Sequence, residues 1–246
     1  MNQRVGIFGA NGYLGSETLY LCRATNIPSV ALGRRIEDLD SSILNQLVTI
    51  IDCGFPRDYY RVKSADDYLK QVQKRAKFCN QRGIKYVYLT TFTSVISDNS
   101  KYARLKNSTE RLVELLGGEL LRLGLVIDLD NPGGRFLELN SMVRRLPIVL
   151  IPSSKWFPIF TCTLNEYLAE IQSFLQNGFL STHHIGKRQS LSELISEVSK
   201  DKKVLKLSEF ATFVLVRLVP LIAFGKREGI KGIAVKNIGA DDRSQY

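Results

Sequence analysis

The sequence predicts an α/β fold: a Rossmann-type doubly wound parallel sheet with a small C-terminal lobe. Three observations support this prediction. A glycine-rich turn follows the first apolar strand, apolar strands alternate with amphipathic helices as far as residue 127, and the rest of the chain is less regular. Regular alternation of strands and helices is typical of a parallel sheet that helices cover on both faces.

The first half of the chain divides into successive strand–helix units. We expect strands at 3–9, 29–33, 48–52, 85–90 and 119–127, and helices at 13–25, 42–47, 65–82 and from 98 or 100 to 116. The run from Val48 to Asp52 is apolar, as buried parallel strands are. Apolar residues recur at helical spacing between Ala65 and Arg82, and Gly83 stands where a helix C-cap belongs.

The less regular pattern in the second half of the chain predicts a smaller structural unit. We expect helices at 136–145, 164–175, 191–198 and 205–224, with a loop at 131–134. The sheet domain is assigned to residues 1–130, with a returning segment near 159–176, and the lobe to residues 131–158 and 177–246. The apolar run 210–224 is too short to span a membrane. Packing on the lobe or on a partner chain is favoured, and contact with an anionic membrane surface stays open.

The glycine-rich turn carries Gly9, Gly12 and Gly15 at three-residue spacing between a strand and a helix. The first glycine allows a tight turn, the second leaves room for a diphosphate, and the third lets the helix pack close to the sheet. The helix that follows points unpaired N–H groups and the positive end of its dipole at the anion. The pattern therefore predicts a dinucleotide-binding domain over residues 1–130.

The end of the second strand indicates which nicotinamide cofactor binds. NAD sites usually carry a carboxylate there, about twenty residues beyond the glycines. Here Arg34 and Arg35 hold that place, and a guanidinium can bind a 2′-phosphate that a carboxylate would repel. We therefore favour NADP(H), with NAD(H) as the alternative because Glu37 and Asp38 lie close by.

The spacing G-x-x-G-x-x-G at the N-terminus resembles the extended or atypical short-chain dehydrogenase/reductase superfamily, which includes nucleotide-sugar epimerases, dehydratases and reductases. A second likeness is Y-x-x-x-K, formed by Tyr102 and Lys106 on one helix face. A nearby ammonium favours the phenolate, which brings the phenol closer to a proton shuttle at neutral pH. Tyr59 and Lys63 repeat the pattern, but they precede the position at which the superfamily has its catalytic helix.

A hydroxyl partner for the tyrosine is expected at the end of the preceding strand. The segment from Tyr88 to Val95 resembles the superfamily's Y-(I/L)-S-S-x-S-V-Y. Counting forward from the strand selects Thr91, whereas counting back from Val95 makes Thr93 the substitute. The loop between Thr91 and the catalytic helix is also shorter than extended members have.

Further likeness concerns the loop that leads into the lobe. Arg122-Leu-Gly-Leu-Val126 followed by Asn131-Pro132-Gly133 resembles R-x-G-x-V-Y-G-P-G, although the tyrosine and the glycine before Pro132 are missing. The compressed region between the second and fourth strands is similar to the dTDP-4-dehydrorhamnose reductase-like branch of the NAD-dependent epimerase/dehydratase family. The resemblance is broad over residues 3–134, patchy over 135–200 and absent beyond.

The resemblance implies the cofactor contacts. They come from the glycine turn, the ends of the following strands, the catalytic helix and the loop into the lobe: Gly9, Asn11, Gly12, Tyr13, Leu14, Gly15, Arg34, Arg35, Cys53, Gly54, Phe55, Thr90, Lys106 and Pro132. Lys106 would hydrogen-bond the nicotinamide ribose, and small Cys53 and Gly54 suit close backbone approach near the adenine ribose.

Composition sets limits on partners and location. The net charge of +10 suits anionic small molecules, and no nucleic-acid module accompanies it. The four cysteines have no C-x-x-C spacing, so we expect reduced thiols in a cytoplasmic protein and no metal site. The first strand follows Met1 almost at once, so we expect no signal peptide. A homodimer stays open.

The resemblance implies an NADP(H)-dependent reductase or epimerase that acts on a nucleotide-activated sugar by hydride transfer, in polysaccharide biosynthesis. Tyr102 would be the general acid/base, Lys106 would lower its pKa, and Thr91 or Thr93 would position the reacting oxygen. The alternative is a catalytically reduced member that binds NAD(P)H as a sensor or assembly factor. The short loop after Thr91 motivates this alternative.

Overall fold

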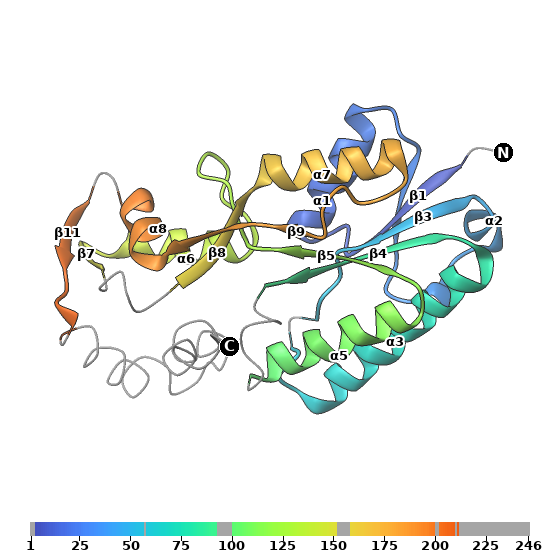
Figure 1. The fold of residues 1–246 in the computed structure, drawn as a ribbon, viewed down its shortest axis with the longest axis horizontal. Coiled ribbons are helices and arrows are strands. Elements are labelled where there is room, and N and C mark those ends of the chain that lie inside the picture. Colours follow the sequence, from blue (N-terminus) through green and yellow to red (C-terminus); the bar gives the residue numbers. More distant parts are fainter. Residues whose placement is uncertain are drawn as a thin grey trace, which may run out of the picture.

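The computed structural model describes residues 3–56, 58–92, 100–151, 158–199, 202–209 and 211, and it has a large and a small lobe (Figure 1). The large lobe is built on a six-stranded sheet in the order β2-β1-β3-β4-β5-β9, and every neighbouring pair runs parallel. Its strands are β1 (Arg4–Phe8), β2 (Ser29–Leu32), β3 (Leu47–Asp52), β4 (Lys85–Thr91), β5 (Glu119–Leu123) and β9 (His184–Ile185).

Helices cover both faces of this sheet (Figure 1). One face carries α1 (Tyr13–Ala24) and α7 (Leu164–Asn177), and the other carries α3 (Val62–Arg82) and α5 (Lys101–Leu115). The short elements η1 (Ile36–Asp38) and α2 (Ser41–Leu44) connect β2 to β3. A separate apolar core fills each face, so the predicted Rossmann-type, doubly wound sheet is confirmed.

Strand register brings the expected site together. Phe8 pairs with Asp52, and Asp52 pairs with Tyr88, so β1, β3 and β4 end near the same edge of the sheet. Ligands of open parallel sheets bind beyond the carboxyl ends of the strands. The glycine turn, the segment after Asp52 and the N-terminus of α5 all follow these strand ends.

The small lobe has its own sheets and core. β6 (Leu125–Ile127), β8 (Pro158–Thr163) and β10 (Lys187–Ser190) form a three-stranded sheet, and β7 (Ile148–Ile151) pairs in parallel with β11 (Lys203–Lys206). Two helices complete the lobe, α6 (Gly134–Arg145) and α8 (Leu191–Val198). Val143, Val149, Ile151 and Ile195 form its core.

The prediction of a single strand over residues 119–127 is wrong. The chain forms β5 and β6 instead, and they belong to different sheets. Gly124 separates them, and a Cβ at this position would lie 2.8 Å from the backbone of Phe160. The apolar run looks continuous in sequence because both strands are buried, and only the close crossing at Gly124 requires the chain to change sheets.

The helix expected at 205–224 begins later than predicted. Leu205 and Lys206 belong to β11, which pairs with β7, whereas Glu209 and Ala211 are helical. Residues 210 and 212–224 lie outside the described residues. Within the described ranges, no helix is long and apolar enough to cross a membrane. His184 and Ile185 fall in the range that the sequence assigns to the lobe, yet they extend the large sheet beside β5.

Candidate active site

The glycine turn has the backbone geometry that a diphosphate site needs. Gly9 has φ +73°, and a Cβ on it would lie 2.7 Å from the backbone nitrogen of Gly54. Gly12 donates its N–H to the Gly9 carbonyl oxygen at 2.8 Å, which closes the turn. A Cβ on Gly15 would lie 2.2 Å from that same oxygen. The close approach of α1 to the turn therefore requires Gly15.

The N-terminus of α1 lies open beside this turn. Its N-cap is Gly12, so no side chain caps the helix, and the first turn carries no acidic residue. Asn11 and Gly12 are exposed, and a Cβ on Gly12 would meet only the Gly9 oxygen, at 3.2 Å. These features fit a diphosphate, which would accept hydrogen bonds from the free N–H groups of the helix.

Tyr13 attaches the loop of the small lobe to this helix. Its hydroxyl lies 3.3 Å from a carboxylate oxygen of Asp128, and a Cβ on Gly133 would lie 2.1 Å from its ring. Burial and then the Asp128 charge raise the pKa of Tyr13 to about 12. Tyr13 therefore holds the 128–134 loop, which contains Pro132, against the start of α1. The sequence did not single out Asp128.

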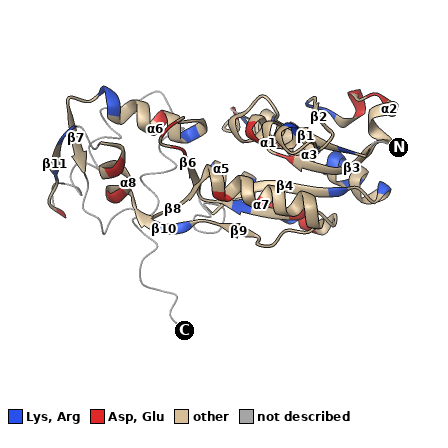
Figure 2. Cartoon of the chain, turned by 90° about the horizontal axis from the view of Figure 1, so that it is seen from above, with Lys and Arg blue, Asp and Glu red and all other residues tan. Residues whose placement is uncertain are grey.

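Arg34 and Arg35 follow β2 and are both exposed. Of the two nearby carboxylates, Glu37 is paired with Lys74 at 2.6 Å, and this contact lowers the pKa of Glu37. Figure 2 shows that basic and acidic residues are spread over both lobes. The arrangement leaves two guanidinium groups accessible to an anion.

A buried ion pair fixes the loop between β3 and α3. The Asp52 carboxylate is fully buried and accepts hydrogen bonds from Arg75 at 2.8 Å, from the Tyr86 hydroxyl at 2.7 Å and from the Gly54 N–H at 2.9 Å. Arg75 also donates to the backbone carbonyl of Arg34. The sequence reasoning missed Arg75. Its position on the same helix face as Val72, Ala76 and Cys79 was the available signal, because a cation on a buried face needs a partner.

Tyr102 lies in the first turn of α5 within an aromatic cluster. Its ring meets Phe55 and Tyr59 edge-on, with centroids 5.1 and 5.5 Å apart. A hydrogen bond joins its phenol to the side chain of Thr91 at the end of β4. Burial raises the pKa of Tyr102, whereas the Arg135 charge and the hydrogen bond with Thr91 lower it. Tyr59, which the sequence excluded by its position, thus lies beside the predicted tyrosine.

Lys106 lies one turn further along α5 and is buried. Its Nζ donates to the Tyr88 hydroxyl at 2.9 Å and to the Leu89 carbonyl oxygen at 3.2 Å. The Phe55 ring covers it, with Nζ 4.5 Å from the centroid. Burial lowers the pKa of Lys106 to about 7, although the Asp52 charge opposes this shift. The hydrogen bonds of Lys106 therefore point toward β4, beneath Phe55.

The remaining predicted residues take different places. Thr91 meets Tyr102, whereas the Thr90 hydroxyl is buried and donates to Glu110 at 2.6 Å. Thr93, the alternative hydroxyl partner, lies outside the described residues. Cys53 donates its backbone N–H to the Phe8 carbonyl oxygen at 3.0 Å, and burial raises the pKa of its thiol to about 12. The segment after β3 thus connects the glycine turn with Tyr102 and Lys106.

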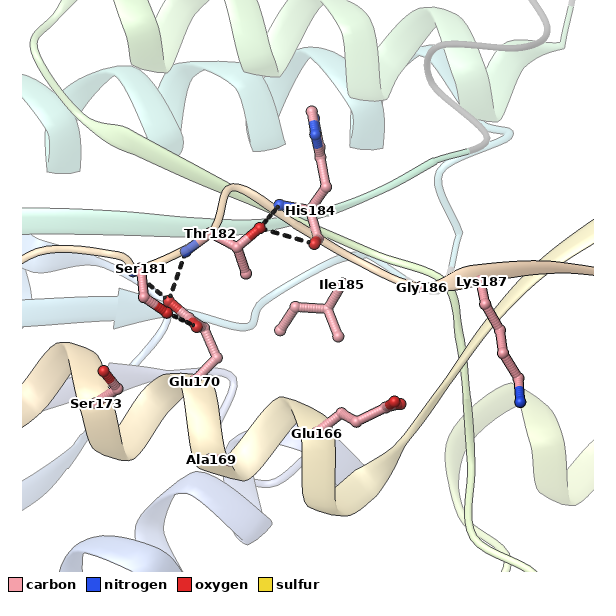
Figure 3. Close-up of a pocket in the computed structure, with 10 residues that line it drawn as sticks. All are labelled: Glu166, Ala169, Glu170, Ser173, Ser181, Thr182, His184, Ile185, Gly186 and Lys187. Carbon is pink, nitrogen blue, oxygen red and sulfur yellow. Dashed lines mark hydrogen bonds between the residues drawn. The ribbon is translucent and has the colours of Figure 1, made fainter.

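A surface hollow of about 520 Å³ lies elsewhere, between α7 and the β9–β10 segment (Figure 3). Glu170 accepts hydrogen bonds there from the backbone of Ser181 at 2.6 Å and of Thr182 at 3.2 Å. The hollow contains none of the predicted site residues. The described residues also contain no cluster of three or more His, Cys, Asp or Glu that could hold a metal ion.

Solved structures share this architecture. dTDP-4-dehydrorhamnose reductase from Yersinia enterocolitica superposes with a TM-score of 0.67, covering 85% of each chain at 13% sequence identity. This reductase therefore shares the Rossmann-type fold of the chain. The Bacillus anthracis reductase, solved in complex with NADP, has a TM-score of 0.65 and 17% identity, and it covers 86% of this chain and 87% of its own.

UDP-N-acetylglucosamine 4-epimerase from Bacillus cereus is similar to the same extent, with a TM-score of 0.66 and 13% identity over 84% of this chain and 85% of its own. No protein-family model matches the sequence, and no curated protein sequence matches it. The similarity to the two reductase structures confirms, at the level of the fold, the expected likeness to the dTDP-4-dehydrorhamnose reductase-like branch.

Proposed function

We propose that this protein is an NADP(H)-dependent reductase or epimerase that acts on a nucleotide-activated sugar. The contact between Thr91 and Tyr102, at the strand edge that also carries the glycine turn, is the observation that supports this proposal most. The named neighbours support the same class, because they include a reductase solved with NADP and an epimerase of UDP-N-acetylglucosamine.

Different groups of residues would bind different parts of the cofactor. The open N-terminus of α1 and the N–H groups around Gly12 would bind the cofactor diphosphate. Arg34 and Arg35 would bind the 2′-phosphate of NADP(H), since both are exposed and Glu37 is paired with Lys74. Tyr13 would hold the 128–134 loop closed over this site.

The chemistry needs a proton at the reacting sugar oxygen. A bound nicotinamide would supply the hydride-transfer chemistry at the sugar carbon. Tyr102 would give the proton to that oxygen during reduction, or take it during oxidation, and the Thr91 hydroxyl would fix the direction of the phenol. Lys106 would complete this set only after its ammonium is freed from Tyr88, because both of its hydrogen bonds now point to β4.

A second candidate is a dinucleotide-binding protein without turnover. The enclosed position of Lys106 favours it, since a buried amine with a pKa of about 7 stabilises a nearby phenolate less than an accessible ammonium does. The glycine turn and the arginines would then serve a sensor or an assembly factor.

Two measurements separate these candidates. Fluorescence titration with NADPH and NADH tests binding, and NADPH absorbance with dTDP- and UDP-sugars, joined to chromatography for epimerisation, tests turnover. Tyr102→Phe should abolish turnover and keep NADPH binding, whereas Tyr20→Phe, an exposed tyrosine on α1, should change neither. Binding without turnover on any tested sugar nucleotide would favour the second candidate, and no binding at millimolar cofactor would contradict both.

A further inference from the structure

Arg135 brings a charge from the small lobe to the predicted tyrosine of the large lobe. It lies in the first turn of α6, and its guanidinium carbon is 4.5 Å from the centroid of the Tyr102 ring. Tyr102 belongs to α5 in the large lobe, so the contact crosses between the two units. A guanidinium over an aromatic face at this distance makes a favourable cation–π contact.

Arg135 and Lys106, the two cations of this region, differ in kind. Lys106 is buried beneath Phe55, and with a pKa of about 7 it is largely neutral in mildly alkaline solution. A guanidinium, in contrast to an amine, is effectively always charged in proteins. The Arg135 charge also lowers the pKa of Lys106, as expected of like charges that share one site.

The other charged and titratable groups around these side chains do not replace Arg135. Tyr102 faces Tyr59 and Glu110, both of which raise its pKa, and burial raises it further. Around Lys106 lie Asp52 and Cys53 from the end of β3, with Tyr88 from β4. Of the groups that lower the pKa of Tyr102 and so favour the phenolate, Arg135 has the larger effect and the hydrogen bond with Thr91 the smaller.

We propose that Arg135 is the positioning residue that sets the ionisation of Tyr102, the electrostatic role that the Y-x-x-x-K pattern assigns to Lys106. The role of Tyr102 as the acid/base rests on the proposed function, whereas its ionisation does not. The arrangement makes the reactivity of the phenol depend on the small lobe, because α6 supplies the charge only while its first turn lies beside Tyr102.

The test is a spectrophotometric titration of tyrosine at 295 nm in the full-length, cofactor-free protein. Subtracting the curve of Tyr102→Phe from that of the unmodified protein gives the titration of Tyr102 alone. Subtracting the curve of Arg135→Gln/Tyr102→Phe from that of Arg135→Gln gives the titration of Tyr102 in the absence of the guanidinium. We expect the Tyr102 midpoint to rise by about one pH unit in the Arg135→Gln background, the lower end of the effect of a charge at this distance. That shift is roughly a tenfold loss of phenolate at a given pH.

Two further variants make the result specific. Arg135→Lys should restore part of the shift, because it keeps a positive charge but loses the planar contact with the ring. Arg145→Gln removes the same charge from the last turn of α6, where the residue is exposed, and it should leave the midpoint unchanged. Circular dichroism verifies that each variant is folded, as expected because Arg135 is exposed.

Equal Tyr102 midpoints with and without the guanidinium would overturn the proposal. A Tyr102 that stays protonated up to alkaline unfolding of the unmodified protein would overturn it as well. Neither result depends on turnover, so the proposed function fails separately, through absent cofactor binding or absent activity on sugar nucleotides.

Discussion

The Nζ atom of Lys106 donates a hydrogen bond to the hydroxyl of Tyr88, 2.9 Å away in the interior of the large lobe. The Tyr88 hydroxyl in turn lies 2.9 Å from the Tyr68 hydroxyl, which donates a hydrogen bond to the Gly54 carbonyl oxygen at 2.8 Å. A chain of hydrogen bonds therefore connects α5, β4 and α3 with the loop after β3. Because its members are buried, their protonation is linked to the stability of the fold.

Lys106 should make stability rise with pH. Its pKa is about 7 in the folded protein, whereas a lysine in an unfolded chain titrates near 10.4. Between these values the unfolded state binds the additional proton, so the free energy of unfolding rises with pH by up to about 1.4 kcal/mol per unit. Below pH 7 both states are charged and the full destabilisation remains.

Urea denaturation at pH 7, 8 and 9 measures this effect. The stability of the unmodified protein relative to Lys106→Met should rise by about 2 kcal/mol from pH 7 to 9. Lys63→Met, an exposed lysine in the first turn of α3, serves as the control and should follow the unmodified protein. Parallel stability curves for the Lys106→Met and unmodified proteins would show that the amine titrates normally.

Gly12 and Gly15 should respond differently to the same added methyl group. A Cβ on Gly15 would lie 2.2 Å from a backbone oxygen, so Gly15→Ala should lose at least 2 kcal/mol of stability. A Cβ on Gly12 meets one atom at 3.2 Å, and its φ of −88° suits alanine, so Gly12→Ala should stay within about 1 kcal/mol.

Cofactor binding distinguishes these two variants further. The Gly12 methyl would occupy the expected place of the diphosphate, so Gly12→Ala should be folded and bind NADPH at least about tenfold more weakly, a loss of roughly 1.4 kcal/mol. Calorimetric titration measures the affinity. Unchanged NADPH affinity in Gly12→Ala would remove the glycine turn from the binding site.

Arg34 and Arg35 should decide between the two nicotinamide cofactors. Replacing both with Ser removes charge-assisted hydrogen bonds to a 2′-phosphate, and NADPH affinity should fall by about 10- to 100-fold. NADH affinity should change by less than about threefold, since NADH lacks that phosphate. Arg23→Ser, at the far end of α1, is the matched control. An equal loss for both cofactors would mean that the arginines act on the diphosphate or on the fold.

Asp52 and Arg75 should behave as one unit. Each single replacement, Asp52→Asn or Arg75→Met, leaves a buried group without its ionic partner and should cost about 3 kcal/mol. The double variant should lose less than the sum of the two, by at least about 1 kcal/mol. Urea denaturation of the four proteins completes this cycle. Additive losses would show that Tyr86 and the Gly54 N–H satisfy Asp52 without Arg75.

Local rules account for most of what could be predicted. The periodicity of apolar residues found the parallel strands and helices of the first half, and the C-cap at Gly83 has the left-handed geometry that glycine favours, with φ +65°. Such features are predictable because a few neighbouring residues determine them. The division of 119–127 between two sheets was not predictable, since it depends on Phe160, which is distant in the chain.

The sequence by itself determined the Rossmann-type sheet, the glycine turn and the helix position of Tyr102, because strand pattern, φ preference and helical spacing are short-range properties of the chain. Only the tertiary structure decided what surrounds that tyrosine. It buried Lys106 against Tyr88 and brought Arg135 from a separate lobe, because desolvation and charge proximity depend on atoms that meet in space from distant parts of the chain.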